Sequence, residues 1–493
     1  MIKAWIFCVL ICTVSASTFI SPQQTALVIG FEKLYDISLL ANTLSDQGID
    51  SILIIPSTIE DIYEHLIEVE VITLNITNAK NAKKEEKALN ACEALITNKK
   101  ILKKIKEIQP TFTIFPALRH DGCLLPWARY INSIPVIWAQ GQEEEYYAIE
   151  NLRMAIPIQT NNFLDRFWSH IQFRAVVSHA ENNYVMSALK LTRKYLNNLE
   201  ETSLDKFYSD VELLLWGYDH VLRSDFATLT QRLVEVGCHH CRGIQPLPTT
   251  LQKDLVEYRL GTIVVTLDKE HKEIMEQLAN RLPQGRQGQA VAWKSKEVKF
   301  TDKKTENIFI DSNVDRQDLI GNPRSRVLLS HCGDTEFLEA AYHGTPVICF
   351  PRNSEEKKNA ARGIELGFSV SLNDNYSIDS IYQTVNLIHE SSIYREAARR
   401  VSLAIRDRPV PASDRMVFWL SFIARNRENA IDFSRLNKDV TIKTLAEDVQ
   451  LLYGIFIGTA FGALFATTTA LTWYYQNKSN KHFVRAKGKK FSR

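Results

Sequence analysis

The chain has 493 residues, with 59 Lys and Arg against 57 Asp and Glu, so its formal net charge is +2. Hydrophobic residues make up 45% and charged residues 24%, as in typical globular proteins. This composition excludes a disordered or collagen-like chain and a polytopic membrane protein, and the balanced charge argues against a nucleic-acid-binding protein. The length predicts two or three domains.

Residues 1–16 are predicted to be a secretory signal peptide. Lys3 precedes an apolar run over residues 4–14 that is too short to span a bilayer, and small residues follow it. Secretion would expose the sequons at Asn75 and Asn375 to glycosylation.

Residues 17–245 are predicted to form an N-terminal α/β domain. An apolar strand at 26–30 precedes a helix with apolar side chains at helical spacing, and a second buried strand follows at 50–55. This strand–helix–strand order predicts a parallel sheet. A charged helix over 79–108 and a strand at 111–115 continue the alternation.

The segment Pro246-Leu247-Pro248 interrupts the chain at its midpoint, and the alternation then restarts. Residues 246–447 are predicted to form a second α/β domain that ends in return helices. Its predicted strands are 262–266, 291–293, 308–310, 327–329 and 346–350. Neither a GxGxxG nor a GxxxxGK[ST] motif is present, which disfavours a dehydrogenase or a P-loop NTPase.

Six cysteines remain after the signal peptide, too few for a scaffold held by disulfides alone. The run Cys238-His239-His240-Cys241 contains four ligand-type side chains. Four adjacent residues cannot easily surround one zinc ion, and no second Cys/His cluster follows. We therefore predict no metal site, and a loop with free or paired thiols.

One segment carries a ligand-binding pattern. The strand ending near residue 330 delivers His331 and Gly333 to the start of a helix, whose free N–H groups and macrodipole favour a phosphate. Gly333 allows a ligand to approach the backbone closely. Glu339, further along this helix, is placed to accept hydrogen bonds from a ribose.

Residues 449–475 are predicted to form one transmembrane helix. The stretch 451–473 holds no charged residue, and its length of roughly 34 Å crosses the hydrocarbon core. Aromatic residues follow, and the tail over 476–493 carries seven Lys and Arg and no acid. The positive-inside rule predicts a type I protein of the endoplasmic reticulum or another secretory membrane, with a lumenal body. Gly454, Gly458 and Gly462 permit pairing with another helix, hence homo- or hetero-oligomers with related chains.

The pattern around His331, together with residues 318–323, 342–346 and 414–419, resembles the UDP-glycosyltransferase family in its membrane-anchored UDP-glucuronosyltransferase branch. The resemblance implies an α/β fold of the GT-B type: two facing Rossmann-like, doubly wound domains plus one C-terminal transmembrane helix. In this fold the C-terminal domain binds a UDP-sugar and the N-terminal domain a small lipophilic acceptor.

The resemblance also implies a chemistry. Glucuronic acid or glucose would pass from the UDP-sugar to the acceptor with inversion, after a His held by an Asp deprotonates the acceptor. No metal and no cofactor beyond the UDP-sugar co-substrate are implied. The implied donor-binding positions are Thr266, Asp268, Arg316, His331, Gly333, Asp334, Thr335, Glu336, Glu339, Glu355 and Glu356.

Several donor positions depart from the family pattern. Asn313 and Arg316 stand where Trp and Gln usually hold the uracil, and two glutamates replace the Asp-Gln pair that contacts the sugar. Asp268, Asp334 and Glu336 lie where the diphosphate is expected. A carboxylate several Å from a phosphate costs on the order of 1 to 4 kcal/mol at intermediate dielectric, so these residues weaken the expected donor affinity.

The implied catalytic pair is also altered. Lys33 occupies the His position, and a lysine of ordinary pKa is protonated at neutral pH and cannot accept a proton. The Asp position falls near Arg119, where His120 and Asp121 offer speculative substitutes. Three hypotheses stay open: an active transferase, a catalytically silent partner or regulator of active transferases, and an enzyme with another donor or base.

Overall fold

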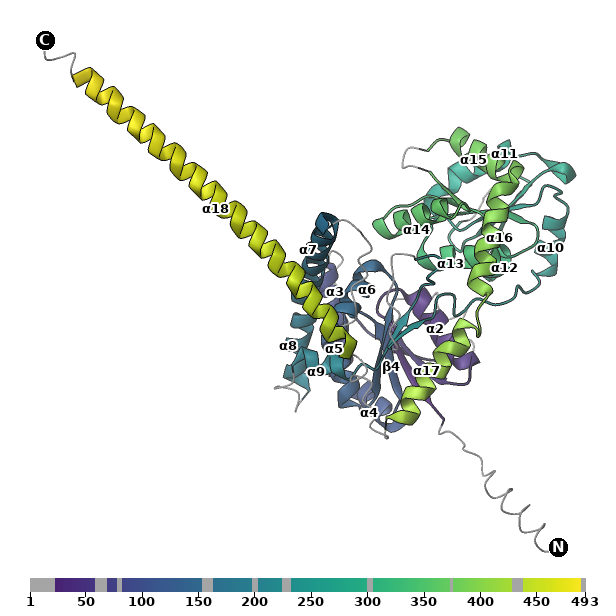
Figure 1. The fold of residues 1–493 in the computed structure, drawn as a ribbon. Coiled ribbons are helices and arrows are strands. Elements are labelled where there is room, and N and C mark those ends of the chain that lie inside the picture. Colours follow the sequence, from purple (N-terminus) through teal and green to yellow (C-terminus); the bar gives the residue numbers. More distant parts are fainter. Residues whose placement is uncertain are drawn as a thin grey trace, which may run out of the picture.

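Two parallel β-sheets, each covered by helices, form the body of the protein in the computed structural model (Figure 1). The structure describes residues 23–57, 69–77, 82–152, 163–196, 203–223, 232–298, 305–372, 376–427 and 438–488. The predicted signal peptide and the sequon at Asn375 lie outside the described residues.

The first sheet has seven strands in the order β3-β2-β1-β4-β5-β6-β7. The strands are β1 (Thr25–Ile29), β2 (Asp50–Pro56), β3 (Glu70–Leu74), β4 (Phe112–Pro116), β5 (Ile134–Ala139), β6 (Leu213–Trp216) and β7 (Leu233–Glu235). Their helices are α2 (Leu34–Asp46), α3 (Lys84–Thr97), α4 (Lys99–Ile108), α5 (Asp121–Tyr130), α6 (Gln142–Asn151), α7 (Phe163–Ala180), η2 (Glu181–Val185), α8 (Met186–Tyr195) and α9 (Leu204–Ser209). The strand order reverses between β1 and β4, where doubly wound sheets bind ligands.

The predicted strands of this half are confirmed, but the single charged helix predicted over 79–108 is wrong. The described part of that segment contains two helices, α3 and α4, which meet at Asn98. The Asn98 side chain accepts a hydrogen bond from the Ile101 N–H and so caps the start of α4. The helical spacing of apolar residues continues on both sides of Asn98, so this spacing does not reveal the boundary. The Asn98 cap marks where α3 ends and α4 begins.

The second sheet has six parallel strands in the order β10-β9-β8-β11-β12-β13. They are β8 (Thr262–Val265), β9 (Ala290–Lys294), β10 (Ile308–Asp311), β11 (Ser325–Ser330), β12 (Val347–Cys349) and β13 (Ser369–Ser371). The helices are α10 (Thr249–Val256), η3 (Lys269–His271), α11 (Lys272–Arg281), η4 (Gly285–Gln287), α12 (Arg316–Ile320), α13 (Asp334–His343), α14 (Ser354–Glu365), α15 (Ile378–Glu390) and α16 (Ser392–Arg406). All five predicted strands of this half overlap an observed strand.

The chain crosses between the two sheets twice. After α16, helix α17 (Ala412–Asn426) returns to the first domain and lies beside α2 (Figure 1). Met416, Leu420 and Ile423 of α17 are buried in the core beneath β1 and β4. The two domains are therefore held together by a C-terminal helix as well as by the linker after β7.

Helix α18 (Lys438–Gly488) extends away from the body, beginning beside α7 (Figure 1). Its segment Tyr453–Lys478 is long and apolar enough to cross a membrane. Gly458 and Gly462 on this segment have open space around the position of a Cβ atom. This helix is the candidate for the predicted anchor.

All six cysteines predicted for the mature chain are paired. The disulfides join Cys92 to Cys123, Cys238 to Cys241, and Cys332 to Cys349. The first links α3 to α5, and the third links the loop after β11 to the end of β12. The Cys238–Cys241 pair uses both thiols of the run considered as a zinc site.

Candidate functional site

The start of α13 lies at the carboxyl end of β11, beside the strand-order reversal of the second sheet. Gly333 precedes the helix, and a Cβ atom built there would meet nothing within 4 Å, so the space above this turn is open. His331 Nδ1 lies 2.8 Å from the Phe350 carbonyl oxygen, to which it donates. His331 Nε2 is buried and forms no hydrogen bond within the described residues, but it lies 3.4 Å from Asp268 Oδ2. Open space and a buried imidazole meet where the sequence predicts the diphosphate, and the Asp268 carboxylate lies beside the imidazole.

The carboxylates at this helix start are already paired. Asp334 Oδ1 accepts a hydrogen bond of 2.8 Å from Asn359 Nδ2. Glu336 accepts one from the Ser330 hydroxyl and lies 3.3 Å from Arg316 Nη1. Their negative charge is partly compensated, which lowers the repulsion that the sequence predicts for a phosphate.

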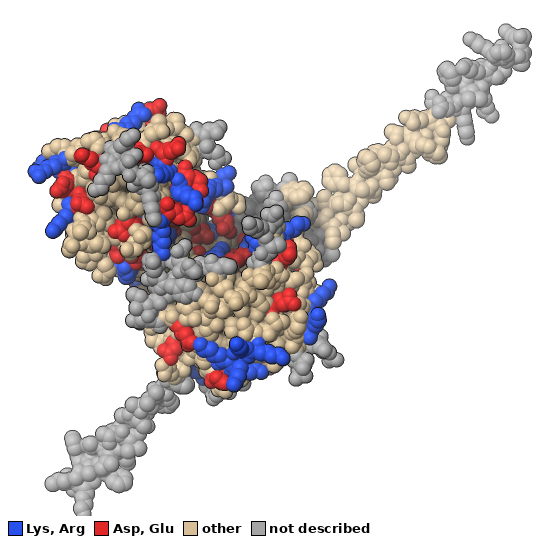
Figure 2. Space-filling model, turned by 180° about the vertical axis from the view of Figure 1, so that it is seen from behind, with Lys and Arg blue, Asp and Glu red and all other residues tan. Residues whose placement is uncertain are grey.

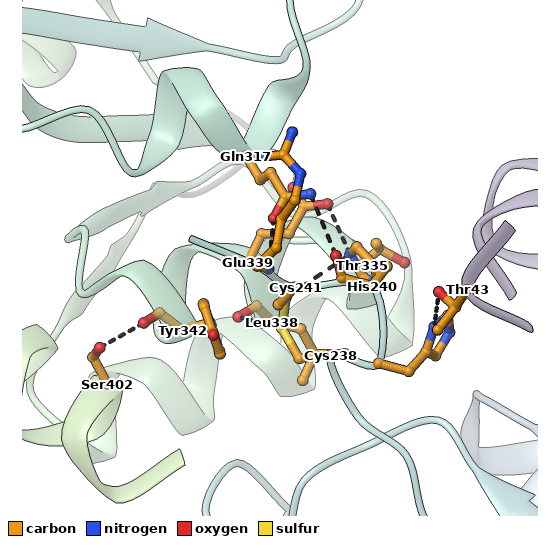
Figure 3. Close-up of a disulfide and its surroundings, with 12 residues drawn as sticks. Thr43, Cys238, His240, Cys241, Gln317, Thr335, Leu338, Glu339, Tyr342 and Ser402 are labelled. Atoms are coloured by element: carbon orange, nitrogen blue, oxygen red, sulfur yellow. Dashed lines mark hydrogen bonds and ion pairs between the residues drawn. A yellow bond between two sulfur atoms is a disulfide. The ribbon is translucent and has the colours of Figure 1, made fainter. Parts of the chain in front are cut away.

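Glu339 is the most strongly bound carboxylate of the site (Figure 3). Arg316 donates to both of its oxygens, with Nε–Oε2 at 2.6 Å and Nη2–Oε1 at 2.9 Å, and His240 Nε2 lies 3.0 Å from Oε1. Burial alone would raise the pKa of Glu339, but Arg316 and His240 outweigh burial and hold the pKa at about 2. A ribose that binds Glu339 must therefore compete with these two donors.

Arg352 forms ion pairs with two more of the predicted donor-binding residues, Asp268 and Glu356. It pairs with Asp268, and its Nη2 lies 3.3 Å from Glu356 Oε1. The Thr266 hydroxyl is 3.4 Å from the Leu329 carbonyl oxygen, so it is used within the sheet. These contacts bring Asp268 and Glu356 together around one guanidinium.

Lys33 lies at the N-terminal-domain side of the cleft, with a left-handed backbone φ of 51°. Its ammonium group donates to the Gln140 carbonyl oxygen and to Glu144 Oε2, the latter at 3.0 Å. Burial alone would lower the pKa of Lys33, but nearby carboxylates including Glu144 and Asp334 raise it above its ordinary value. Lys33 is thus a cation at neutral pH and cannot act as a base.

The Glu355 side chain, from the second domain, extends toward the Lys33 ammonium group. A Cβ atom built on Gly141 would lie 2.7 Å from Glu355 Oε1 and 2.9 Å from Lys33 Nζ. Gly141 has a φ of 123°, which residues other than glycine rarely adopt, and its lack of a Cβ atom leaves room for both side chains as they lie here. The predicted sugar-contacting residue Glu355 therefore meets the predicted base position across the domain junction.

The speculative substitutes His120 and Asp121 do not form a pair. No hydrogen bond joins them within the described residues. His120 is buried against Phe31, and burial together with Arg119 lowers its pKa to about 3. Asp121 instead accepts a 2.6 Å hydrogen bond from the Tyr208 hydroxyl. Arg119, at the implied Asp position, is ion-paired with Glu32.

Glu144 was not singled out in the sequence. It follows Gly141 near the start of α6, and burial raises the pKa of its carboxyl group to about 7 despite the nearby Lys33. A run of three glutamates, 143–145, looks like an ordinary acidic first turn of a helix. Only the three-dimensional contact with Lys33 distinguishes the middle one.

The two domains also touch directly at α13. The Thr335 hydroxyl donates to Asp36 of α2 and accepts from Gln140 Nε2 at 3.4 Å. The Arg316 guanidinium lies 4.8 Å from the centre of the Tyr35 ring. Figure 2 shows the hollow between the domains, in which both acidic and basic side chains lie. A substrate that enters this hollow must displace some of these contacts.

Within the described part of the chain, one group of three metal-ligand side chains occurs elsewhere, formed by Asp219, His220 and Glu235. Two arginines already lie on it: Arg408 Nη2 is 2.8 Å from Asp219 Oδ2, and Arg415 Nη1 is 3.5 Å from Glu235 Oε2. These cations compensate the carboxylates, so the group joins the chain after α16 to the first domain.

Comparisons with known proteins agree with this geometry. The family model described as UDP-glucoronosyl and UDP-glucosyl transferase matches residues 55–442. The chain is 24% identical over 369 residues to UDP-glucuronosyltransferase 2B30 of Macaca fascicularis, covering 68% of this chain and 65% of that protein. It is 30% identical over 202 residues to UDP-glucuronosyltransferase 2A2 of Mus musculus, covering 39% and 37%. The matches thus span less than two thirds of these relatives.

Solved structures share the fold. A UDP-glucosyltransferase from Polygonum tinctorium superposes with a TM-score of 0.55 at 14% identity, covering 82% of this chain and 99% of that one. Phytolacca americana UGT2, complexed with UDP-2-fluoroglucose and pterostilbene, gives 0.56 at 14% identity, covering 81% and 99%. The chain, with its two facing parallel-sheet domains of the GT-B class, belongs to the UDP-glycosyltransferase family.

Proposed function

We propose that this protein transfers a sugar, glucuronic acid or glucose, from a UDP-sugar to a small lipophilic acceptor in the cleft between its domains. The observation that carries the proposal is the open turn at Gly333, at the start of α13 and beside the buried imidazole of His331. Free N–H groups and the dipole of a helix start favour a diphosphate. Family membership supplies the donor class.

We infer that Glu144 is the base. Its pKa of about 7 is close to neutral pH, and a general base is most effective when its pKa lies near the pH at which it works. Lys33, which stands at the position that the resemblance assigns to a histidine, lies 3.0 Å from Glu144 Oε2 and would hold this carboxylate beside that position. Glu144 takes the proton of the acceptor hydroxyl as its oxygen attacks the anomeric carbon. The bond from that carbon to the phosphate oxygen breaks, and UDP leaves with inversion.

The test measures acceptor-dependent UDP release by the full-length protein in detergent, with both UDP-sugars and a panel of lipophilic alcohols and phenols. We expect Glu144→Gln to lower the rate by about 10²-fold or more, the usual size of general-base catalysis. Glu143→Gln, at the exposed neighbouring position, and His120→Ala should stay within about two-fold. Normal turnover in Glu144→Gln with loss in His120→Ala would move the base to His120.

A second candidate function is a catalytically silent partner of active family members. The ion pairs at both implied catalytic positions, Lys33 with Glu144 and Arg119 with Glu32, favour it. Calorimetry with millimolar UDP separates the two functions, because a silent scaffold with an occupied cleft should show no binding and no UDP release. Association with an active relative should then be lost when Gly458 and Gly462 become Leu.

We also propose the type I orientation predicted for this chain, in the endoplasmic reticulum or another secretory membrane. The segment Tyr453–Lys478 would span the bilayer and the basic tail would lie in the cytosol. Asn75 is exposed just after β3, so a lumenal body would carry a glycan there. On a gel, endoglycosidase treatment should increase the mobility of the wild-type protein, and Asn75→Gln should remove one such shift. A band that is identical in wild type and Asn75→Gln and unaffected by the enzyme would contradict lumenal exposure of this site.

A further inference from the structure

The Cys238–Cys241 disulfide closes a tight loop between the two domains (Figure 3). The loop lies in the linker between β7 and α10. His239 Nδ1 lies 3.0 Å from the Thr43 hydroxyl of α2, and Cys238 Sγ lies 3.5 Å from the Leu338 carbonyl oxygen of α13. A change in this loop therefore acts on both domains at once.

Solvent reaches this disulfide more readily than the other two. Cys241 is partly exposed and Cys238 is 6% exposed, whereas the four cysteines of the other disulfides are 0% exposed. Thiol–disulfide exchange requires an attacking thiolate to reach a disulfide sulfur. In the folded protein such an attack is open at Cys241 and blocked at the two buried disulfides.

The fold also depends least on this disulfide. Its cysteines are 3 residues apart in sequence, against 31 and 17 for the other pairs. A crosslink reduces the number of conformations open to the unfolded chain by a factor that grows with about the 3/2 power of loop length. For the Cys238–Cys241 disulfide this factor is smaller than for the other two disulfides, on the order of ten- to thirty-fold. Cutting this disulfide should leave both sheets folded.

The disulfide holds the loop in an unfavourable backbone conformation. Cys238 has a φ of 59°, in the left-handed region that residues other than glycine rarely adopt. Breaking the S–S bond removes one of the constraints that keep it there. His240 would move with the loop, and its Nε2 lies 3.0 Å from Glu339 Oε1 and 3.9 Å from Cys241 Sγ. The redox state of the loop is thereby coupled to the candidate donor site.

We propose that Cys238–Cys241 is a thiol–disulfide exchange site whose co-reactant is a dithiol, and that its redox state sets the contact between His240 and Glu339. A thiolate of the dithiol attacks Cys241 Sγ, the S–S bond breaks, and Cys238 leaves as a thiolate that takes up a proton. The second thiolate of the dithiol then attacks its own sulfur in the mixed disulfide. This closes a cyclic disulfide and releases Cys241, which is protonated in turn. Two electrons and two protons pass from the dithiol to the protein.

The first test maps the reduced cysteines. Full-length protein in detergent is treated with graded dithiothreitol, its free thiols are blocked with N-ethylmaleimide, and the blocked residues are located by mass spectrometry. We expect Cys238 and Cys241 to be blocked at a dithiothreitol concentration at least ten-fold below that needed for the other four cysteines. Equal concentrations for all six, or blocking of the buried pairs first, would overturn the assignment.

The second test follows the consequence by hydrogen–deuterium exchange. Reduction should speed exchange several-fold in residues 236–245 and at the end of α13, while the strands of the first sheet stay unchanged. The double variant Cys238→Ser/Cys241→Ser should show the fast exchange with and without dithiothreitol. Unchanged exchange in wild-type protein whose Cys238–Cys241 bond has been cut would overturn the coupling to His240. Because neither readout involves sugar transfer, failure of this proposal is distinct from failure of the proposed function.

Discussion

Replacing Asp121 with Asn tests whether a buried acid limits the stability of the first domain. The Asp121 side chain is 0% exposed; its Oδ2 accepts from Tyr208, and its Oδ1 has no hydrogen-bond partner among the described residues. Burial raises the pKa of Asp121 from its ordinary value of 3.8 to about 7. The carboxyl group is therefore neutral in the folded protein at pH values where it is ionised in the unfolded chain.

The direction and size of the effect follow from proton linkage. Below about pH 4 both states hold the proton, and above pH 7 neither does, so the folded state loses stability as the pH rises between these limits. A difference of about 3 pKa units corresponds to about 4 kcal/mol at 1.36 kcal/mol per unit. Asn cannot ionise but keeps an oxygen for Tyr208, and its unpaired amide costs about 1–3 kcal/mol. The variant should thus gain stability relative to wild type as the pH rises from 5 to 8, and should be equal or more stable at pH 8.

Thermal unfolding at pH 5, 6, 7 and 8 measures this relative gain in stability. Asp205→Asn, on the exposed face of α9, controls for the loss of one negative charge. Tyr208→Phe should steepen the pH dependence, because it removes the hydrogen bond that favours the ionised carboxylate. A constant difference in melting temperature between wild type and Asp121→Asn across this range would refute a raised pKa at Asp121.

Three further substitutions address the packing of the two domains. Arg316→Ala removes the bidentate partner of the buried Glu339 and should cost about 3–5 kcal/mol in denaturant unfolding; a change below about 0.5 kcal/mol would mean that His240 alone satisfies this carboxylate. Leu420→Ala should cost about 2–5 kcal/mol, since this α17 side chain is 0% exposed in the first core, and a neutral result would mean that α17 docking is dispensable. Gly122→Ala places a methyl group against the backbone of η2 and should lower the yield of folded protein, whereas wild-type yield would mean that η2 shifts without cost.

Local patterns in the sequence were sufficient to predict the two parallel sheets covered by helices. Buried strands such as 26–30 and 262–266 are short apolar runs bounded by turn residues, and their alternation with helices implies parallel sheets. The end of one helix and start of the next at Asn98 escaped this reasoning, because the apolar spacing continues on both sides of the cap. The strands and helices that show a local apolar pattern were therefore predicted. The boundary between α3 and α4 was not, because it depends on one side-chain hydrogen bond at Asn98.

The sequence by itself determined that His331 and Gly333 lie at the start of a helix that also carries Glu339, because all three belong to one strand–turn–helix segment. Only the tertiary structure decided the charge state of the site. Arg316 reaches Glu339 across 23 residues and Lys33 reaches Glu144 across 111, so no local pattern reveals either contact. Burial and neighbouring charges then set each pKa, and these depend on which side chains the two sheets bring together. For that reason the sequence could name Lys33 as a poor base but could not point to Glu144.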